Sequence, residues 1–225
     1  MIPWLDCDGS FPPLAKALAS PNGLLCAGGD LSPGRILEAY RRGIFPWFSE
    51  GDPILWWSPD PRMVLFPEEL KVSRSLKRVV ARGAYDIRFD TSFRAVIEAC
   101  AAPRSGQGGT WIVPEMVEAY TKLHELGHAH SVEAWKDGEL AGGLYGLALD
   151  RVFFGESMFA RAPDASKAAL VALVERLRER DCRVIDCQQA TPHLASLGAR
   201  EIPRKVFAQL LGESIQYPLS PRHWK

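Results

Sequence analysis

An acid and an amide, Asp186 and Gln188, are spaced so that they could hold a reacting group together. They close the segment 183–188 (RVIDCQ), whose pattern predicts a short strand. Because side chains alternate along a strand, residues two apart share a face and lie roughly 6–7 Å apart. A carboxylate and a carboxamide there can share a hydrogen bond that turns the amide oxygen toward an attacking amine. Alternatively, the pair is buried and satisfied by backbone groups.

A third candidate, Glu156, lies in the sequence FFGESMF at the end of an expected strand. Its apolar neighbours would leave the carboxylate in need of a partner. That partner is either a cationic substrate group or a structural salt bridge. Gly155, just before it, would let another backbone or a ligand approach closely.

The elements that must position these groups alternate between strands and helices. Apolar patterning predicts strands at 85–90, 129–135, 140–149, 152–158 and 183–188. Helical spacing with capping residues and stop glycines predicts helices at 33–43, 74–82, 93–100, 114–127, 165–179 and 203–211. Three neighbouring strands, a helix and another strand make a mixed layer, so we expect an α+β fold.

Large aromatic residues crowd the segment 21–62. They are Phe45, Trp47, Phe48, Trp56 and Trp57. They could form a stiff apolar wall for a ligand, or attach a small domain to its neighbour. The segment 53–67 is dense in proline, so we interpret it as a connection. We therefore expect a small N-terminal domain over residues 1–62 and a larger domain over residues 63–225.

The helix expected at 74–82 has one face on which every charged residue is basic. Residues 71–82 hold five basic residues and no acid. On one side of the helix lie Arg74, Lys77, Arg78 and Arg82. An ordinary solvated face usually mixes both signs, so we favour contact with a polyanion. A non-catalytic RNA-binding module would explain this face, but it would leave Asp186, Gln188 and Glu156 without a role.

The composition of the 225-residue chain limits which partners and which cellular compartment we expect. With 47% hydrophobic residues it can bury a core, and its formal net charge of +0 means that a local patch must hold any anionic partner. Five cysteines without a CxxC pair favour reduced thiols. The N-terminus lacks signal-peptide features, and no apolar run would span a bilayer. We therefore expect a cytoplasmic protein with no membrane partner.

The segment 124–128 (HELGH) matches the HExxH pattern of zinc peptidases. That chemistry needs both histidines one turn apart on a continuing helix, and Gly127 interrupts it here. We expect no metal site, and keep a zinc hydrolase as an alternative. A coenzyme A acyltransferase is a further alternative, although the segment 159–165 (FARAPDA) lacks the usual glycine pair.

Several motifs occur in one order: PNGLLCAGGDLSP, GIFPWF, DPILWWSPDPR, HELGHAHSVE, GGLYG, FFGESMF, DASKAAL and IDCQ. Over residues 21–203 they resemble the bacterial leucyl/phenylalanyl-tRNA–protein transferases. The resemblance implies a larger domain with the GNAT acyltransferase fold. It also implies transfer of Leu or Phe, with Met weaker, from aminoacyl-tRNA to the α-amine of proteins that begin with Arg or Lys, which marks them for degradation. No cofactor is implied, because the ester is already activated. We expect a monomer.

The resemblance also implies roles for individual residues. Asp186 would orient Gln188, Gln188 would hold the attacking amine, and Glu156 would place a substrate group. The helix at 74–82 would grip the tRNA acceptor end. The aminoacyl side chain would lie in an apolar pocket of Trp47, Trp111, Leu144, Phe153, Met158, Leu170 and Ile185. Apolar pockets discriminate by only about 1–3 kcal/mol per methylene, so we expect a graded preference.

Overall fold

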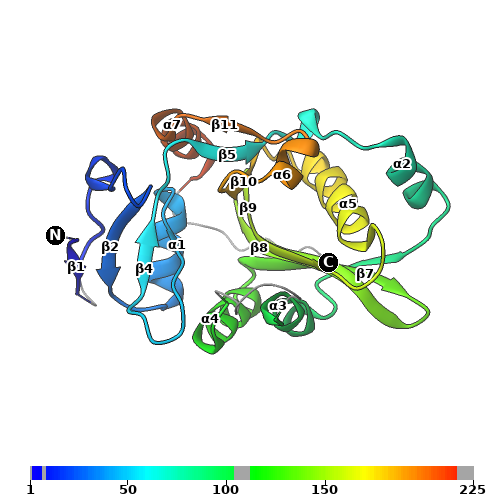
Figure 1. Cartoon of the computed structure of the whole chain (residues 1–225), viewed down its shortest axis with the longest axis horizontal. Helices are drawn as coiled ribbons and strands as arrows, with labels where there is room; N and C mark the ends of the chain where they lie inside the picture. Colours follow the sequence, from blue (N-terminus) through cyan, green and yellow to red (C-terminus); the bar gives the residue numbers. More distant parts are fainter. Residues whose placement is uncertain (1, 7–8, 104–111, 217–225) are drawn as a thin grey trace.

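In the part of the chain that the structure describes, two β-sheets and the helices that pack on them make up the fold (Figure 1). The structure, a computed structural model, describes residues 2–6, 9–103 and 112–216. The smaller sheet has the strand order β1-β2-β4-β3, and the larger one has the order β11-β5-β10-β9-β8-β7-β6. Apart from the parallel β9–β10 pair, neighbouring strands of the larger sheet run antiparallel. The expected α+β class with a mixed sheet is confirmed.

The smaller sheet explains most of the aromatic segment. Its strands are β1 (Trp4–Leu5), β2 (Leu24–Gly28), β3 (Phe45–Pro46) and β4 (Leu55–Trp57). Trp56 is fully buried, and its indole N–H donates to the carbonyl of Gly28 at 2.9 Å. The Trp57 indole donates to the carbonyl of Trp47 at 2.7 Å. These aromatics are therefore mainly core, although Trp47 itself is 36% exposed.

The candidate residues Glu156, Asp186 and Gln188 lie on strands of the larger sheet. Its strands are β5 (Arg62–Leu65), β6 (Asp86–Phe89), β7 (Ala129–Lys136), β8 (Glu139–Leu149), β9 (Val152–Ala160), β10 (Val184–Gln188) and β11 (Arg200–Ile202). The expected strands at 85–90, 129–135, 140–149, 152–158 and 183–188 are confirmed. The strands β5 and β11 were not predicted from the sequence.

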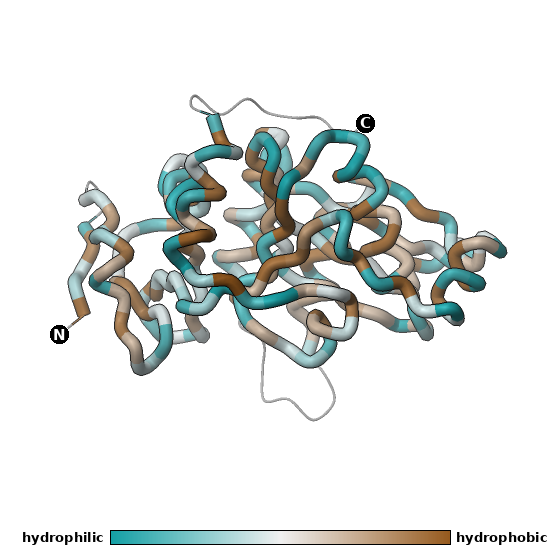
Figure 2. Tube along the Cα trace, turned by 90° about the horizontal axis from the view of Figure 1, so that it is seen from above, coloured by the Kyte–Doolittle hydropathy of each residue, from teal (hydrophilic) through white to brown (hydrophobic). Residues whose placement is uncertain are grey.

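The helices cover both faces of the larger sheet (Figure 1). They are α1 (Pro33–Arg41), α2 (Arg74–Ala81), α3 (Phe93–Ala101), α4 (Pro114–Glu125), α5 (Ala165–Glu179), α6 (Pro192–Ser196) and α7 (Arg204–Ser214). The side chain of Tyr145 packs with α3 and α4, whereas that of the preceding Leu144 packs with α5. In Figure 2 the outer helices alternate between hydrophilic and hydrophobic positions, as helices with one apolar face should. Within the described residues, every helix is too short or too polar to cross a bilayer.

One interpretation of the sequence was wrong: the segment 53–67 is more than a connection. It contains β4 and β5, and β5 lies between β11 and β10 in the sheet. Its four residues are all buried, so they show none of the alternation that reveals a half-exposed strand. Flanking prolines hid it further. The division into residues 1–62 and 63–225 stays a prediction.

The sheet loses its regularity where the candidate residues lie. Pairing between β9 and β10 runs from Val184–Val152 to Asp186–Phe154, so Glu156 and Gln188 lie beyond the last paired residues. The register of β10 against β5 shifts between Asp186 and Gln188. The register of β8 against β9 shifts at Gly146, which is paired with Gly155. These breaks let side chains leave the regular faces of the sheet.

The break on β8 predicts a strict requirement for glycine at position 146. A Cβ added there would lie 2.1 Å from the carbonyl oxygen of Phe154 and 2.6 Å from the ring of Phe153. We expect Gly146→Ala to lower the free energy of unfolding by about 1–3 kcal/mol, measured by urea denaturation.

Gly212→Ala in α7 is the matched control, because a Cβ there meets nothing within 4 Å. It should raise helix stability by about 0.5–1 kcal/mol. Equal effects of the two substitutions would contradict this account of Gly146.

Candidate active site

A buried ion pair lies at the base of the site. The guanidinium of Arg62 donates to both carboxylate oxygens of Asp186, at 2.8 and 2.6 Å, and both side chains are fully buried. Arg62 also donates to the carbonyl of Gly43 at 3.1 Å. The rings of Phe45 and Phe207 each lie 4.8 Å from the guanidinium carbon. The pair thus joins β5 and β10 to the chain around β3 and to α7.

The predicted hydrogen bond between the Asp186 carboxylate and the Gln188 carboxamide was wrong. Asp186 instead accepts from the backbone N–H of Gln188 at 2.9 Å. Gln188 has a φ of +63°, in the left-handed region, so the strand does not continue its regular alternation through this residue. Because Asp186 is fully buried, it cannot touch a substrate directly. Its place is behind the site, holding the backbone from which Gln188 extends.

Glu156 takes the orienting role that the sequence suggested for Asp186. The carboxamide nitrogen of Gln188 donates to Oε1 of Glu156 at 3.0 Å. With its nitrogen held there, the amide turns its oxygen away from Glu156 and keeps it available as an acceptor. The two residues that the sequence placed on separate strands are therefore in direct contact.

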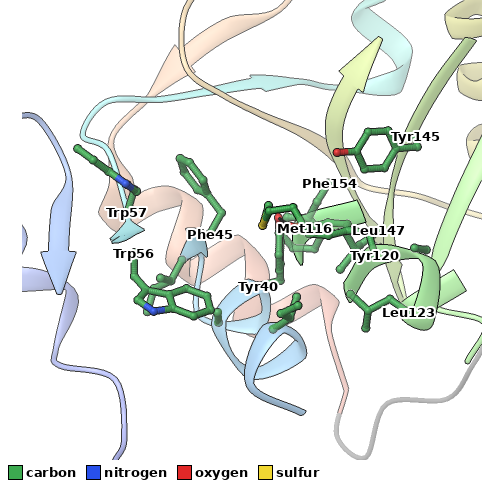
Figure 3. Close-up of a cluster of buried hydrophobic side chains, with 14 of the residues drawn as sticks. Tyr40, Phe45, Trp56, Trp57, Met116, Tyr120, Leu123, Tyr145, Leu147 and Phe154 are labelled. Atoms are coloured by element: carbon green, nitrogen blue, oxygen red, sulfur yellow. Dashed lines mark hydrogen bonds between the residues drawn. The ribbon is translucent and has the colours of Figure 1, made fainter. Parts of the chain in front are cut away.

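Two tyrosines also donate hydrogen bonds to the Glu156 carboxylate. The Tyr40 hydroxyl donates to Oε1 at 2.8 Å and the Tyr120 hydroxyl to Oε2 at 3.4 Å. The two hydroxyl oxygens also lie within hydrogen-bond distance of each other. Figure 3 shows Tyr40 from α1 next to Tyr120 from α4 in the buried cluster. Neither tyrosine was predicted to take this role, although a tyrosine on the apolar face of each helix signals a buried hydroxyl that needs a partner.

Burial controls the ionisation of this cluster. It raises the pKa of Glu156 to about 8, and the charge of Asp186 adds to the rise. The hydrogen bonds from Tyr40 and Tyr120 and the charge of Arg62 oppose it. Burial also raises the pKa of each of the two tyrosines well above its ordinary value, so both stay protonated and act as donors.

An apolar cavity of about 470 Å³ opens beside these groups. Five of the seven predicted pocket residues line it: Leu144, Phe153, Met158, Leu170 and Ile185. Glu156 and Gln188 form part of its polar edge. Trp47 lines a second, adjoining cavity of about 260 Å³, which also contacts Glu156 and Gln188. Trp111 lies outside the described residues.

Cys187, between Asp186 and Gln188, lines both cavities. The break at Gln188 brings the end of β10 to the cavity edge. Burial raises the pKa of the Cys187 thiol, which keeps it protonated and argues against a role as nucleophile.

The predicted basic face lies on α2. Ser73 caps the helix by accepting from the backbone N–H of Leu76 at 3.2 Å, and the buried Leu76 anchors it. The four basic side chains are exposed: Arg74, Lys77, Arg78 and Arg82. None of them forms an ion pair with another residue of the described ranges. The one-sign surface is therefore open to solvent.

The HELGH segment does not form the zinc-peptidase arrangement. α4 ends at Glu125, Gly127 has a φ of +79°, and β7 begins at Ala129. His124 and His128 thus do not share a continuous helix, as Gly127 predicted. The His124 ring instead contacts the carbonyl of Ala129 at 2.8 Å. Across residues 2–6, 9–103 and 112–216, no cluster of three potential metal ligands occurs.

The buried ion pair predicts a marked non-additivity. Arg62→Met or Asp186→Leu alone would leave an unpaired buried charge and should lower the free energy of unfolding by about 3–5 kcal/mol. The double variant should lose less free energy of unfolding than the two single variants lose together, since neither charge remains. Urea denaturation of the four proteins measures this.

Arg94→Met is the matched control. Arg94 pairs with Glu118 at 2.6 Å, but both side chains are more than half exposed. This substitution should lower the free energy of unfolding by about 0–1 kcal/mol. A similar small cost for Arg62→Met would mean that the buried pair does not hold the site together.

Comparison with known proteins identifies related sequences. Residues 64–212 match the sequence model of the family described as leucyl/phenylalanyl-tRNA protein transferase, and residues 29–60 match the model of its N-terminal domain. Proteins named leucyl/phenylalanyl-tRNA–protein transferase are similar over the whole chain. The one from Nitrosospira multiformis is 62% identical over 100% of this chain and 97% of its own length. The one from Stutzerimonas stutzeri is 58% identical over 100% of both.

Among solved structures, a GCN5-related N-acetyltransferase from Kribbella flavida is 12% identical, with a TM-score of 0.39 over 75% of this chain and 60% of that one. A ribosomal-protein-alanine N-acetyltransferase from Brucella melitensis is 17% identical, with a TM-score of 0.36 over 63% of this chain and 99% of that one.

Proposed function

The chain belongs to the leucyl/phenylalanyl-tRNA–protein transferase family, and we propose that it moves Leu or Phe, and Met more weakly, from aminoacyl-tRNA to proteins that begin with Arg or Lys. It is an aminoacyltransferase. The α-amine of the acceptor protein attacks the ester carbonyl, a peptide bond forms, and the tRNA leaves. Because the ester is already activated, the enzyme mainly has to position the two substrates and stabilise charge.

The apolar cavity is the proposed site for the aminoacyl side chain. Its walls are aliphatic and aromatic, and its volume suits one large apolar group. The ester would then lie at the polar edge, beside Glu156 and Gln188. The adjoining cavity, with Trp47 on its wall, offers room for a second substrate group. Trp111 stays a proposed pocket residue.

The observation that carries this proposal is the Gln188 carboxamide, held by Glu156 at the border of the two cavities. Its free oxygen can accept a hydrogen bond from the attacking amine and keep the nitrogen lone pair directed at the carbonyl. Asp186 acts behind it as a positioning residue, through the backbone of Gln188 and through Arg62. Glu156 also contributes to placing the substrates.

We further propose that the exposed basic face of α2 grips the tRNA acceptor end through phosphates, without reading sequence. The modified proteins would be marked for degradation in the cytoplasm, and the enzyme would act as a monomer. A zinc hydrolase and a non-catalytic tRNA-binding module are not favoured, because full-length relatives at 58–62% identity are named as transferases.

Transfer of labelled Leu from charged tRNA to a peptide that begins with Arg tests the site. Gln188→Ala should lower kcat by about 10²-fold, because the amine loses its orienting partner. The fold should stay intact, since Gln188 is only half-buried. The exposed Gln209→Ala in α7 is the matched control and should retain full activity. Equal kcat for the two variants would remove Gln188 from the mechanism.

Salt dependence of tRNA affinity tests α2. Reversing Lys77 and Arg78 to Glu should weaken binding of charged tRNA and reduce the slope of log affinity against log salt by about 1 for each lost phosphate contact. Reversing the exposed Lys136 and Lys205 to Glu makes the same change in net charge on other elements. Should both double variants bind alike, α2 is not the tRNA site.

A further inference from the structure

The position of Glu156 suggests more than a role in positioning. The side chain lines both the apolar cavity and the adjoining cavity, yet the residue is only 9% exposed. Among the described residues, the groups that hydrogen-bond to its carboxylate are neutral: the hydroxyls of Tyr40 and Tyr120 and the amide of Gln188. A carboxylate without a directly paired cation can accept a proton without breaking an ion pair.

The proposed reaction requires a proton to move at this place. An amine nitrogen that has bonded to the ester carbonyl carries a positive charge until it loses a proton. The oxygen of the departing tRNA needs a proton in turn. Gln188 would hold the attacking amine by its carboxamide oxygen, and the same carboxamide touches Glu156 at 3.0 Å. Because the oxygen that holds the amine points away from Glu156, the carboxylate lies beyond direct hydrogen-bond distance of the reacting nitrogen, and one bridging water molecule would connect the two.

We propose that Glu156 is the general base of the transfer: through one bridging water molecule, its carboxylate takes a proton from the attacking nitrogen as the C–N bond forms, and then gives that proton to the 3′-oxygen of the tRNA as the ester C–O bond breaks. The step uses the unprotonated amine and ends with an amide, a 3′-hydroxyl and a regenerated carboxylate. It needs no cofactor. This inference rests on the proposed function and deepens it.

The surroundings of Glu156 suit it to this exchange. The ionisable groups that face it from the packed elements are Tyr40 of α1, Tyr120 of α4, Tyr145 of β8, Arg62 of β5 and Asp186 of β10. Burial and the charge of Asp186 raise the pKa of Glu156 to about 8, against the hydrogen bonds from Tyr40 and Tyr120 and the charge of Arg62. General bases work best when their pKa lies near the operating pH. Hydrogen bonds from the tyrosines lower this pKa, so losing one hydroxyl should raise it.

The pH profile of the full-length enzyme with Leu-charged tRNA and an Arg-starting peptide tests the proposal. In the wild type, the amine must be free and Glu156 ionised, so log kcat/KM should rise with a slope of about 2 below both pKa values. In Glu156→Gln, only the amine titrates, so the slope should fall to about 1. The rate should also fall by about 10²–10⁴-fold near pH 8, after correction for spontaneous ester hydrolysis.

Tyr40→Phe supplies an independent second variant that keeps the carboxylate. Because it removes a hydrogen bond to the ionised form, it should shift one apparent pKa of the profile upward. The loss of kcat/KM in Tyr40→Phe relative to the wild type should therefore be largest near pH 7 and should shrink above pH 9. Tyr85→Phe removes a hydroxyl that bonds to the carbonyl of Pro163 instead, and should leave the profile unchanged. The exposed Glu139→Gln is the control for loss of a carboxylate.

The outcomes separate the two proposals. A Glu156→Gln profile that runs parallel to the wild type, or a Tyr40→Phe deficit that is constant with pH, would overturn the general-base role and leave the proposed function standing. A wild-type enzyme that transfers no Leu to the peptide at any pH would overturn the proposed function itself.

Discussion

The buried ion pair between Arg62 and Asp186 is the constraint on which the site depends. Removing two charges from water is costly, and this pair compensates with two short hydrogen bonds and a third from Arg62 to the carbonyl of Gly43. Aromatic rings on both sides of the guanidinium favour its charge. Since its partners come from β5, β10, the chain before β3, and α7, the pair fixes the smaller sheet against the larger one at the point where Gln188 begins.

Asp186 and Glu156 are two buried carboxylates in different electrostatic settings. The charge of Asp186 is matched by a guanidinium that contacts both of its oxygens. Glu156 contacts neutral donors, and burial leaves its ionised form less favoured. One carboxylate is therefore suited to holding structure and the other to exchanging a proton. The negative charge of Asp186 also lies close enough to raise the pKa of Glu156, which favours proton exchange at Glu156.

The sequence predicted regular elements well and irregular ones poorly. The strands β7, β8 and β9 are eight to eleven residues long and rich in apolar residues, so the sequence located them although β7 and β8 are buried on both faces. The strand β5 has only four residues, all buried, and carried no comparable signal. The five residues of the apolar cavity followed from the family resemblance. The partners of Glu156 could not be predicted, because Tyr40 and Tyr120 are 80 residues apart and meet only through tertiary packing.

The break at the end of β10 explains why the pairing of Asp186 with Gln188 was misjudged. In a regular strand, residues two apart share a face, so both would enter the cavity or both would be buried behind it. An exposed Asp186 would lose its shielded contact with Arg62, and a buried Gln188 could not reach a substrate. The shifted register, with Gln188 in the left-handed region, places the two side chains in different surroundings. The backbone N–H of Gln188 still donates to the Asp186 carboxylate, with 2.9 Å between nitrogen and oxygen. The local cost of that conformation, about 1–3 kcal/mol, is of the size that surrounding structure can offset. The proposed roles of Asp186 and Gln188 thus require a departure from the regular alternation of a strand.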